Sequence, residues 1–291
     1  MEVVLAVGAA IAFGASDFVG GLLSRRAAVF SVVLVSQVVS LVGVLAALLL
    51  WETGFSAEAL GWGAAAGIAG AAGASALYRG LSIGRMGVVA PISGVLAAVI
   101  PVVFGLAFGE RPGAIAVVGV ALGLVAVTAV SRQPDPVAAA APASISDDPV
   151  PGDTRSRRGV LEGLAAGVGF GLFFVLLERS PSDSGLWPLA GMRVSIIVLV
   201  GCIVVIAGLG VEIGSRSIVR LGALGLLNVI ADLLYLLATR HGLLSLVAVI
   251  TSLYPAVTVL LARSILHERM DRSQVVGLVL AVVSVVLIAL S

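Results

Sequence analysis

The chain has 291 residues, of which 60% are hydrophobic and 11% are charged, and its mean hydropathy is +1.19. Soluble domains carry roughly 25% charged residues, so this composition excludes an ordinary soluble enzyme, a nucleic-acid-binding protein and a disordered chain. The formal net charge of +1 gives no reason to expect a polyanionic partner. The composition therefore predicts a multi-pass protein in the lipid bilayer of the cell membrane.

Ten stretches are long and apolar enough to cross a bilayer as helices, which requires about 20 residues each. All are too long for strands, so we predict an all-α membrane protein with ten transmembrane helices and with both termini on one side. In chain order the predicted helices are Val3–Leu23, Ser31–Trp51, Ala59–Leu81, Gly87–Phe108, Gly113–Ser131, Gly159–Leu177, Leu186–Leu209, Ile218–Thr239, Leu243–Arg263 and Ser273–Leu290.

One connection, from Arg132 to Arg158, is much longer than the others and contains five prolines together with Asp, Ser and Ala. Such a segment cannot bury enough apolar surface to become ordered, so we interpret it as a flexible linker. It divides the chain into a first unit of residues 1–131, the linker 132–158 and a second unit of residues 159–291.

The two units share short motifs at an offset of 158 residues. Glu110-Arg111 aligns with Glu268-Arg269, and Val117-Val118-Gly119 aligns with Val275-Val276-Gly277. Because each unit holds five spans, an odd number, the second copy enters the membrane upside down. We therefore predict two inverted five-helix repeats, an arrangement in which secondary transporters place the substrate site between the halves.

Four short motifs make the chain similar to EamA-type members of the drug/metabolite transporter superfamily. They are Phe13-Gly14-Ala15-Ser16, Gly109-Glu110-Arg111, Ser252-Leu253-Tyr254-Pro255 and His267-Glu268-Arg269. The resemblance implies ten helices in two halves and export of a small organic metabolite, an amino acid or a drug. It also implies cytoplasmic termini, whereas the loops opposite the termini hold eleven arginines against three on the terminal side, which indicates the reverse. The side of the termini is left open.

Three charged residues, Asp17, Arg193 and Asp232, lie well inside apolar spans. A charge there costs about 2.5–3.5 kcal/mol on insertion scales and indicates function by default. With a rise of about 1.5 Å per residue, Arg193 and Asp232 reach the same depth, roughly 10 Å, on two neighbouring helices. We predict that they pair directly or through the substrate, whose carboxylate or amine could replace either partner.

Polar residues also share one face of the eighth predicted span: Asn228, Asp232, Tyr235 and Thr239. We interpret this face as site lining, and the alternative is a stripe of hydrogen bonds that only joins helices. We interpret Phe170, Phe173 and Phe174 as lipid-facing or core residues, and the alternative is that they wall a cavity for an aromatic or apolar substrate.

In the ninth predicted span, a similar polar face is formed by Thr251, Tyr254, Pro255 and Thr258. Pro255 removes a backbone hydrogen bond and frees a carbonyl about one turn earlier. Lining of a cavity and a plain helix kink are equal alternatives for this proline.

Asp17 has no obvious counter-charge. Gln37 lies at its depth and Arg79 slightly shallower, so each is a candidate partner. The stretch Ser16-Asp17-Phe18-Val19-Gly20 resembles the first helix of the small multidrug resistance family, in which an acidic residue couples proton movement to drug export. A carboxylic acid buried without a close cation can gain and lose a proton. Asp17 is therefore either the coupling carboxylate or a structural group held by Gln37 or Arg79.

Together these observations predict a secondary transporter that works by alternating access and is coupled to protons, with no enzymatic activity, cofactor or metal. The alternatives are a polytopic enzyme acting on lipid-linked substrates and a non-transporting membrane subunit. The expected partners are the bilayer, a small-molecule substrate and protons, with no nucleic acid, and the oligomeric state is open. The predicted substrate-binding or coupling residues are Asp17, Gln37, Arg193, Asn228, Asp232, Tyr235, Thr251, Tyr254 and Pro255.

Overall fold

The structure is a computed structural model, and it describes residues 1–24, 29–50, 54–83, 86–131, 152–208, 218–267 and 270–291. Within these ranges the chain is helical and contains no strand, in agreement with the predicted all-α fold. The helices are α1 (Glu2–Ser24), α2 (Val29–Leu50), α3 (Ala57–Ile83), α4 (Met86–Ala107), α5 (Ala114–Ser131), α6 (Gly152–Glu178), α7 (Trp187–Ile206), α8 (Ile218–His241), α9 (Leu244–Thr251), α10 (Tyr254–Leu266) and α11 (Arg272–Ala289).

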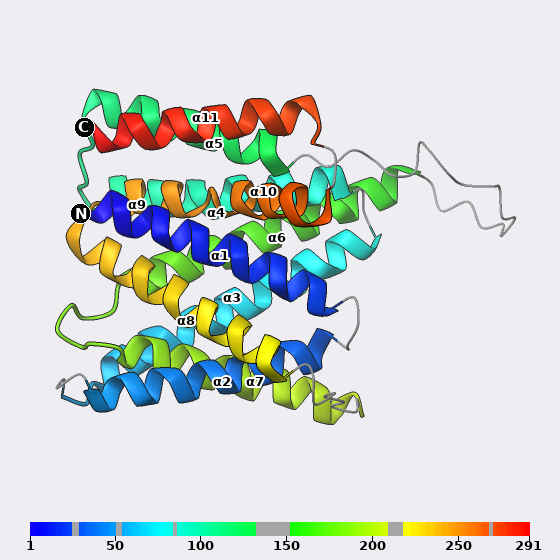
Figure 1. The fold of residues 1–291 in the computed structure, drawn as a ribbon, viewed down its shortest axis with the longest axis vertical. Coiled ribbons are helices and arrows are strands. Elements are labelled where there is room, and N and C mark those ends of the chain that lie inside the picture. Colours follow the sequence, from blue (N-terminus) through cyan, green and yellow to red (C-terminus); the bar gives the residue numbers. More distant parts are fainter. Residues whose placement is uncertain (25–28, 51–53, 84–85, 132–151, 209–217, 268–269) are drawn as a thin grey trace, which may run out of the picture.

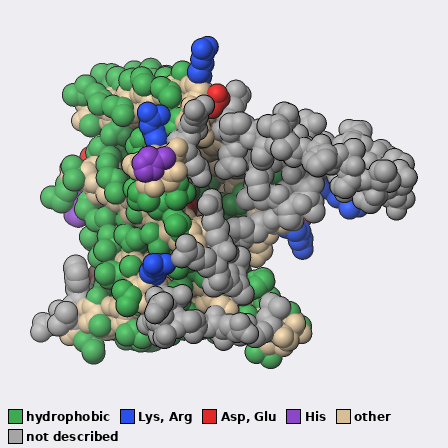
Figure 2. Space-filling view, turned by 45° about the vertical axis from the view of Figure 1, so that its right-hand side comes forward, with side chains coloured by type: hydrophobic (Ala, Val, Ile, Leu, Met, Phe, Trp, Pro, Cys, Tyr) green, Lys and Arg blue, Asp and Glu red, His purple; other side chains and the backbone are tan. Residues whose placement is uncertain are grey.

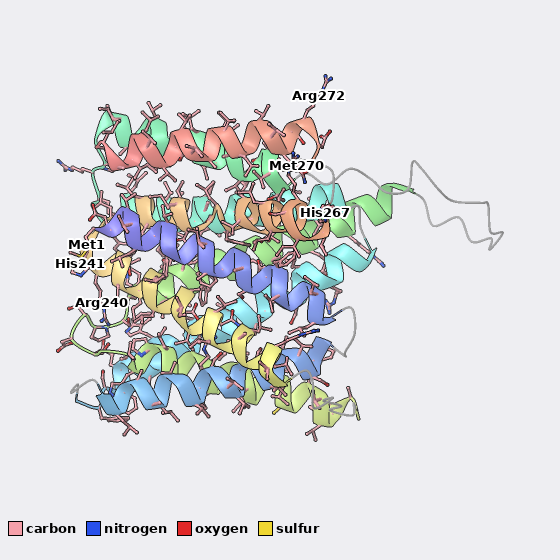
Figure 3. All side chains as sticks on the ribbon, viewed as in Figure 1. Met1, Arg240, His241, His267, Met270 and Arg272 are labelled. Carbon is pink, nitrogen blue, oxygen red and sulfur yellow. The ribbon has the colours of Figure 1, made fainter. Side chains whose placement is uncertain are left out.

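The long helices lie side by side and run roughly along one common direction (Figure 1). Both chain termini lie at one end of this stack, as an even number of spans predicts. We call it the terminal end, and Figure 3 shows Met1 and His241 there. His267 and Arg272 lie at the other end, which we call the opposite end.

Each of the ten predicted spans falls on helical structure. In the described part of the chain, nine helical stretches are long and apolar enough to cross a membrane, and Ile92–Ala107 in α4 is a shorter apolar stretch. Helix α6 begins at Gly152, inside the predicted linker, because no proline lies between Pro151 and the end of α6 at Glu178 and because arginine favours the helix beyond the apolar span. The rest of the linker, 132–151, and the motif residues Glu268 and Arg269 lie outside the described residues.

The ninth predicted span is broken into two helices. Helix α9 ends at Thr251 and α10 begins at Tyr254, with Pro255 at the start of α10. The carbonyl of Thr251 cannot accept a hydrogen bond four residues later, because Pro255 has no N–H group. The proline thus marks an interruption inside a membrane-length stretch, and the cavity described below borders it at Tyr254.

The helices around the centre of the molecule form two groups, each containing helices from both predicted units. In the first, α1 and α2 pack against α8, and α1 also contacts α9 and α10; we call this the α1 bundle. In the second, α3 packs against α6 and α7, and α4 packs against α6; we call this the α3 bundle. Helices α5 and α11 pack against each other beside them (Figure 1).

Glycine permits a close approach between helices of the α3 bundle. A Cβ atom on Gly169 of α6 would lie 2.6 Å from the backbone nitrogen of Gly73 on α3, so a larger residue would push these helices apart.

The outer surface is mostly apolar. Figure 2 shows hydrophobic side chains over most of the described surface on the visible face, with a few Arg, Asp and His side chains among them. Exposed Val4, Leu49, Val103 and Val219 come from four different helices. A soluble protein does not expose apolar surface on this scale, so the protein is a multi-pass membrane protein whose outer surface contacts lipid.

Candidate functional site

A cavity of about 670 Å³ lies between the α1 bundle and the α3 bundle. Its lining comes from α1, α2, α8 and α10 on one side and from α3, α4, α6 and α7 on the other. The volume falls in the range of roughly 300–1,000 Å³ that is typical of small-molecule sites. The sequence predicts a site between the two units, but the cavity divides the molecule differently, because each bundle combines helices of both units.

The cavity extends toward the opposite end of the molecule. Its lining there includes Gly21, three residues before the end of α1, and Val32, three residues after the start of α2. Toward the terminal end, Asp232 is nine residues from the end of α8, and Phe13 is eleven residues from the start of α1. A molecule therefore has the shorter path into the cavity from the opposite end.

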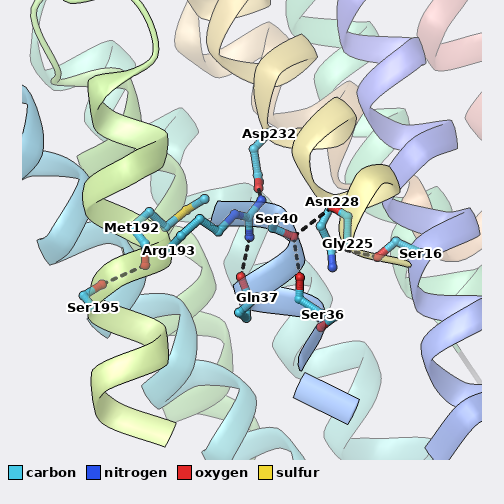
Figure 4. Close-up of polar contacts among 10 residues, drawn as sticks. All are labelled: Ser16, Ser36, Gln37, Ser40, Met192, Arg193, Ser195, Gly225, Asn228 and Asp232. Atoms are coloured by element: carbon cyan, nitrogen blue, oxygen red, sulfur yellow. Dashed lines mark hydrogen bonds and ion pairs between the residues drawn. The ribbon is translucent and has the colours of Figure 1, made fainter. Parts of the chain in front are cut away.

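A buried ion pair joins the two bundles at the inner end of the cavity. Arg193 on α7 donates from Nη2 to the carboxylate of Asp232 on α8, and from Nη1 to Oε1 of Gln37 on α2 at 2.8 Å (Figure 4). Arg193 and Asp232 are only 2% and 3% exposed, so their charges are compensated mainly by each other. The pairing that helix depth predicts is present.

The polar face of α8 is shared between the cavity and helix contacts. Asn228 lines the cavity and accepts a hydrogen bond of 2.6 Å from the hydroxyl of Ser16 on α1. Tyr235 is fully buried, lies outside the cavity lining and donates to the backbone carbonyl of Phe174 at 2.9 Å. Thr239 donates to the carbonyl of Leu236 in its own helix. Asn228 and Asp232 thus line the site, whereas Tyr235 and Thr239 form hydrogen bonds with helix backbone outside the lining.

The predicted face of the ninth span is also divided. Tyr254 lines the cavity, and its ring lies 6.4 Å from that of Phe13. Thr251 and Pro255 lie outside the lining, and the Thr251 hydroxyl is fully buried with no hydrogen-bond partner among the described residues. Of the nine predicted site residues, the structure brings six to the cavity: Asp17, Gln37, Arg193, Asn228, Asp232 and Tyr254.

Asp17 is the carboxylate in this cavity without a counter-charge. The residue is exposed and lines the cavity, and in the described part of the chain it has no hydrogen bond or ion pair. Both predicted partners are wrong. Gln37 accepts from Arg193 instead, and Arg79 forms an ion pair of 3.4 Å with Glu162 on α6 at the surface. Equal depth does not fix the direction in which a side chain points around its helix axis.

Aromatic side chains form much of the remaining lining, and sequence reasoning missed most of them. Phe170, Phe173 and Phe174 line the cavity from α6, and Phe13 lines it from α1, one turn before Asp17. The lipid-facing interpretation is wrong for all three, whereas Phe174 is also a buried core residue with Phe173 packed against that core. A cavity-facing phenylalanine has the same sequence signature as a lipid-facing one. The spacing of four residues between Phe13 and Asp17 was the signal that could have joined them on one face.

Further contacts hold the two bundles together at the terminal end. Arg240, at the end of α8, donates to the carbonyls of Pro181 and Gly185 in the connection between α6 and α7. Glu110, after α4, accepts hydrogen bonds from the backbone N–H groups of Leu244 and Ser245 at the start of α9, at 2.5 and 3.0 Å.

Membrane-length helices thus surround a cavity that lies between two bundles. Residues 157–290 match the model of the EamA-like transporter family, which belongs to the drug/metabolite transporter superfamily. The resemblance inferred from short motifs is thereby confirmed over the second half of the chain. Members of this family are transporters rather than enzymes.

Comparison with solved structures supports the fold alone. A structure titled only "Crystal structure of protein" matches 96% of this chain and 96% of its own, with a TM-score of 0.70 and 20% sequence identity. No curated protein matches the chain.

Proposed function

We propose that the protein is a secondary transporter of the cell membrane that exports a small organic molecule by alternating access. The observation that carries the proposal is the cavity between the two bundles, which extends toward one end while polar contacts join the bundles at the other. Alternating access requires such a site to be reached from one side at a time. The family match over residues 157–290 supports transport as the class of function.

The proposed mechanism uses two inverted five-helix repeats, 1–131 and 159–291, with ten transmembrane spans. The helix contacts support this arrangement, because they keep their pattern when the repeats are exchanged. Helix α1 packs on α8 as α6 packs on α3, α2 contacts α8 as α7 contacts α3, and α1 contacts α9 and α10 as α6 contacts α4. When two inverted repeats exchange their arrangements, the protein can adopt two related conformations, each open to a different side of the membrane.

The substrate that the cavity favours is neutral or cationic with an apolar or aromatic body. Arg193 and Asp232 compensate each other, so Asp17 is the remaining charge in the lining. An anionic substrate would have to displace Asp232 from Arg193 and would meet Asp17 as well. The rings of Phe13 and Phe174 offer apolar contact and cation–π attraction beside that carboxylate.

We infer that Asp17 is the coupling carboxylate. Its exposure to the cavity lets it exchange protons with water there, and the absence of a described counter-charge leaves it able to do so. The repeat places Phe174 at the corresponding position of the second unit, so the cavity has one such carboxylate rather than two. Binding of a proton and of a cationic substrate at one carboxylate would exclude each other, and this competition links their movements in opposite directions.

The proposal is tested by comparing small molecules in the medium of cells with and without the protein. A compound enriched by the protein is then offered to proteoliposomes that contain the purified chain, with empty liposomes as control. We expect movement of a neutral or cationic compound that depends on the protein and is driven by a pH gradient. Failure of every enriched compound to move in proteoliposomes would contradict a transport function.

A further inference from the structure

Glu110 connects the two bundles through a helix end. It follows α4 of the α3 bundle, and its two carboxylate oxygens accept hydrogen bonds from the Leu244 and Ser245 N–H groups of α9 in the α1 bundle. The first N–H groups of a helix have no partner within the helix, and the positive end of the helix dipole lies there. A carboxylate is therefore well suited to this position.

The local sequence of α9 leaves this capping role to a distant residue. The residue at the N-cap of α9 is Leu243, whose side chain accepts no hydrogen bond. Serine, threonine, aspartate or asparagine normally fills that role from within the helix. Here Glu110 supplies the acceptor from 134 residues earlier in the chain.

The end of α4 is shaped to let the Glu110 carboxylate reach α9. The Glu110 N–H donates to the Gly105 carbonyl at 2.9 Å, and Gly109 has a φ of +97°, which turns the chain back over the helix end. A Cβ atom on Gly105 would lie 2.6 Å from the Glu110 carboxyl carbon. Only glycine at position 105 leaves room for the carboxylate in this place.

Helix α9 links this contact to the cavity. It has eight residues, of which Leu244, Ser245 and Val247 to Thr251 are buried, and it ends at the interruption before Tyr254, which lines the cavity. Within the α3 bundle, the guanidinium of Arg179, which follows α6, lies 3.6 Å from the centre of the ring of Phe108, which follows α4. The position of α9 therefore depends on an acceptor carried by the other bundle.

We propose that Glu110 is a positioning residue for transport, which holds the terminal end closed by capping α9 across the boundary between the two bundles. The proposal rests on the alternating-access function above. For the terminal end to open, α4 and α9 must separate, and both Glu110 hydrogen bonds break in that step. Loss of the carboxylate therefore favours the conformation that is open at the terminal end.

The test uses sided thiol labelling and needs no knowledge of the substrate. In a Cys202→Ser background, which removes the single native cysteine, Ile196→Cys places a thiol in the cavity lining on α7. A membrane-impermeant maleimide is applied to sealed vesicles of each orientation. With Glu110 intact, we expect labelling mainly from the opposite end.

Glu110→Ala is expected to raise labelling from the terminal end about tenfold relative to labelling from the opposite end, which equals about 1.4 kcal/mol. Glu110→Gln, which keeps one acceptor but loses the charge, is expected to give a smaller increase. Glu162→Gln is the matched control, because its ion pair with Arg79 lies within the α3 bundle, and labelling should not change.

Unchanged sidedness in both Glu110 variants would overturn the proposal. The midpoint of thermal unfolding in detergent reports whether each variant is folded. If Glu110→Ala is unfolded, Glu110→Gln provides the test. If Glu110 variants shift the labelling but the intact protein moves no compound in proteoliposomes, the proposed transport function fails and the role of Glu110 in closing the terminal end stands.

Discussion

The terminal half and the opposite half of the molecule hold the two bundles together in different ways. In the terminal half, polar contacts cross the boundary from Arg193 to Asp232, from Tyr235 to Phe174, from Arg240 to the connection between α6 and α7, and from α9 to Glu110. Toward the opposite end, apart from the hydrogen bond from Arg193 to Gln37, the described side-chain contacts stay inside one bundle: Ser16 with Asn228, Ser40 with the Gly225 carbonyl, and Arg79 with Glu162.

Under the proposed alternating access, this difference indicates which contacts must change for the cavity to open at the terminal end. Contacts within a bundle survive a rotation of one bundle against the other, whereas contacts between bundles break. The cavity reaches toward the end where, apart from the Arg193–Gln37 hydrogen bond, the described side-chain polar contacts do not cross the boundary. A buried ion pair gives geometric specificity more reliably than stability, so the Arg193–Asp232 pair is suited to define one conformation without locking it.

The largest expected effect comes from breaking the buried ion pair. Asp232→Ala leaves the Arg193 guanidinium buried without its counter-charge, which costs roughly 3–5 kcal/mol. We expect a lower midpoint of thermal unfolding in detergent and loss of transport. The double variant Arg193→Met/Asp232→Leu removes both charges and should recover most of the lost stability. Equal destabilisation in the single and double variants would show that the pair is not the cause.

A smaller effect is expected from Tyr235→Phe. The change removes the hydrogen bond to the Phe174 carbonyl, which lies within α6, at a cost of about 0.5–1.5 kcal/mol. Because the bond crosses between the bundles, terminal-end labelling of a cavity cysteine should increase. Thr239→Val is the control, since the Thr239 hydroxyl bonds to Leu236 within its own helix and its loss should not alter sidedness. An equal shift in both variants would contradict the assignment.

The smallest effect is expected from Arg79→Gln. The Arg79 side chain is 71% exposed, and its ion pair with Glu162 joins two helices of the same bundle. Exposed pairs contribute about 0–1 kcal/mol, so neither the unfolding midpoint nor the sidedness of labelling should change measurably. A clear change in sidedness would mean that the boundary between the bundles runs elsewhere at this end.

The sequence allowed the apolar spans and the depth of the charged residues to be predicted, because both follow from one-dimensional spacing. The Arg193–Asp232 pair is correct for this reason: the two residues lie at one level on consecutive helices. The predicted partners of Asp17 are wrong because depth says nothing of rotation about the helix axis, and Gln37 faces Arg193 instead. The role of Glu110 could not be predicted, although its motif repeats, because its partners lie 134 and 135 residues away and are backbone groups.

The division of the helices into two bundles was also beyond sequence reasoning. Short connections predict that consecutive helices are neighbours, but α1 packs mainly on α8, and α3 packs mainly on α6 and α7. These contacts join the two units, so the boundary of the cavity does not follow the linker. The phenylalanines of α6 show the same limit, since hydropathy does not distinguish a wall of a cavity from a face in lipid.

The central claim, that the cavity between the bundles is the transport site and Asp17 its coupling carboxylate, is tested most directly with Asp17→Asn in proteoliposomes. Asparagine keeps the size of the side chain but cannot bind and release a proton at this site. With the compound identified for the intact protein, the variant should exchange substrate at equal pH on both sides, with weaker binding where the compound is cationic, and should lose accumulation driven by a pH gradient. Glu162→Gln should keep both activities. Accumulation by the Asp17→Asn protein equal to that of the unmodified chain would contradict the account.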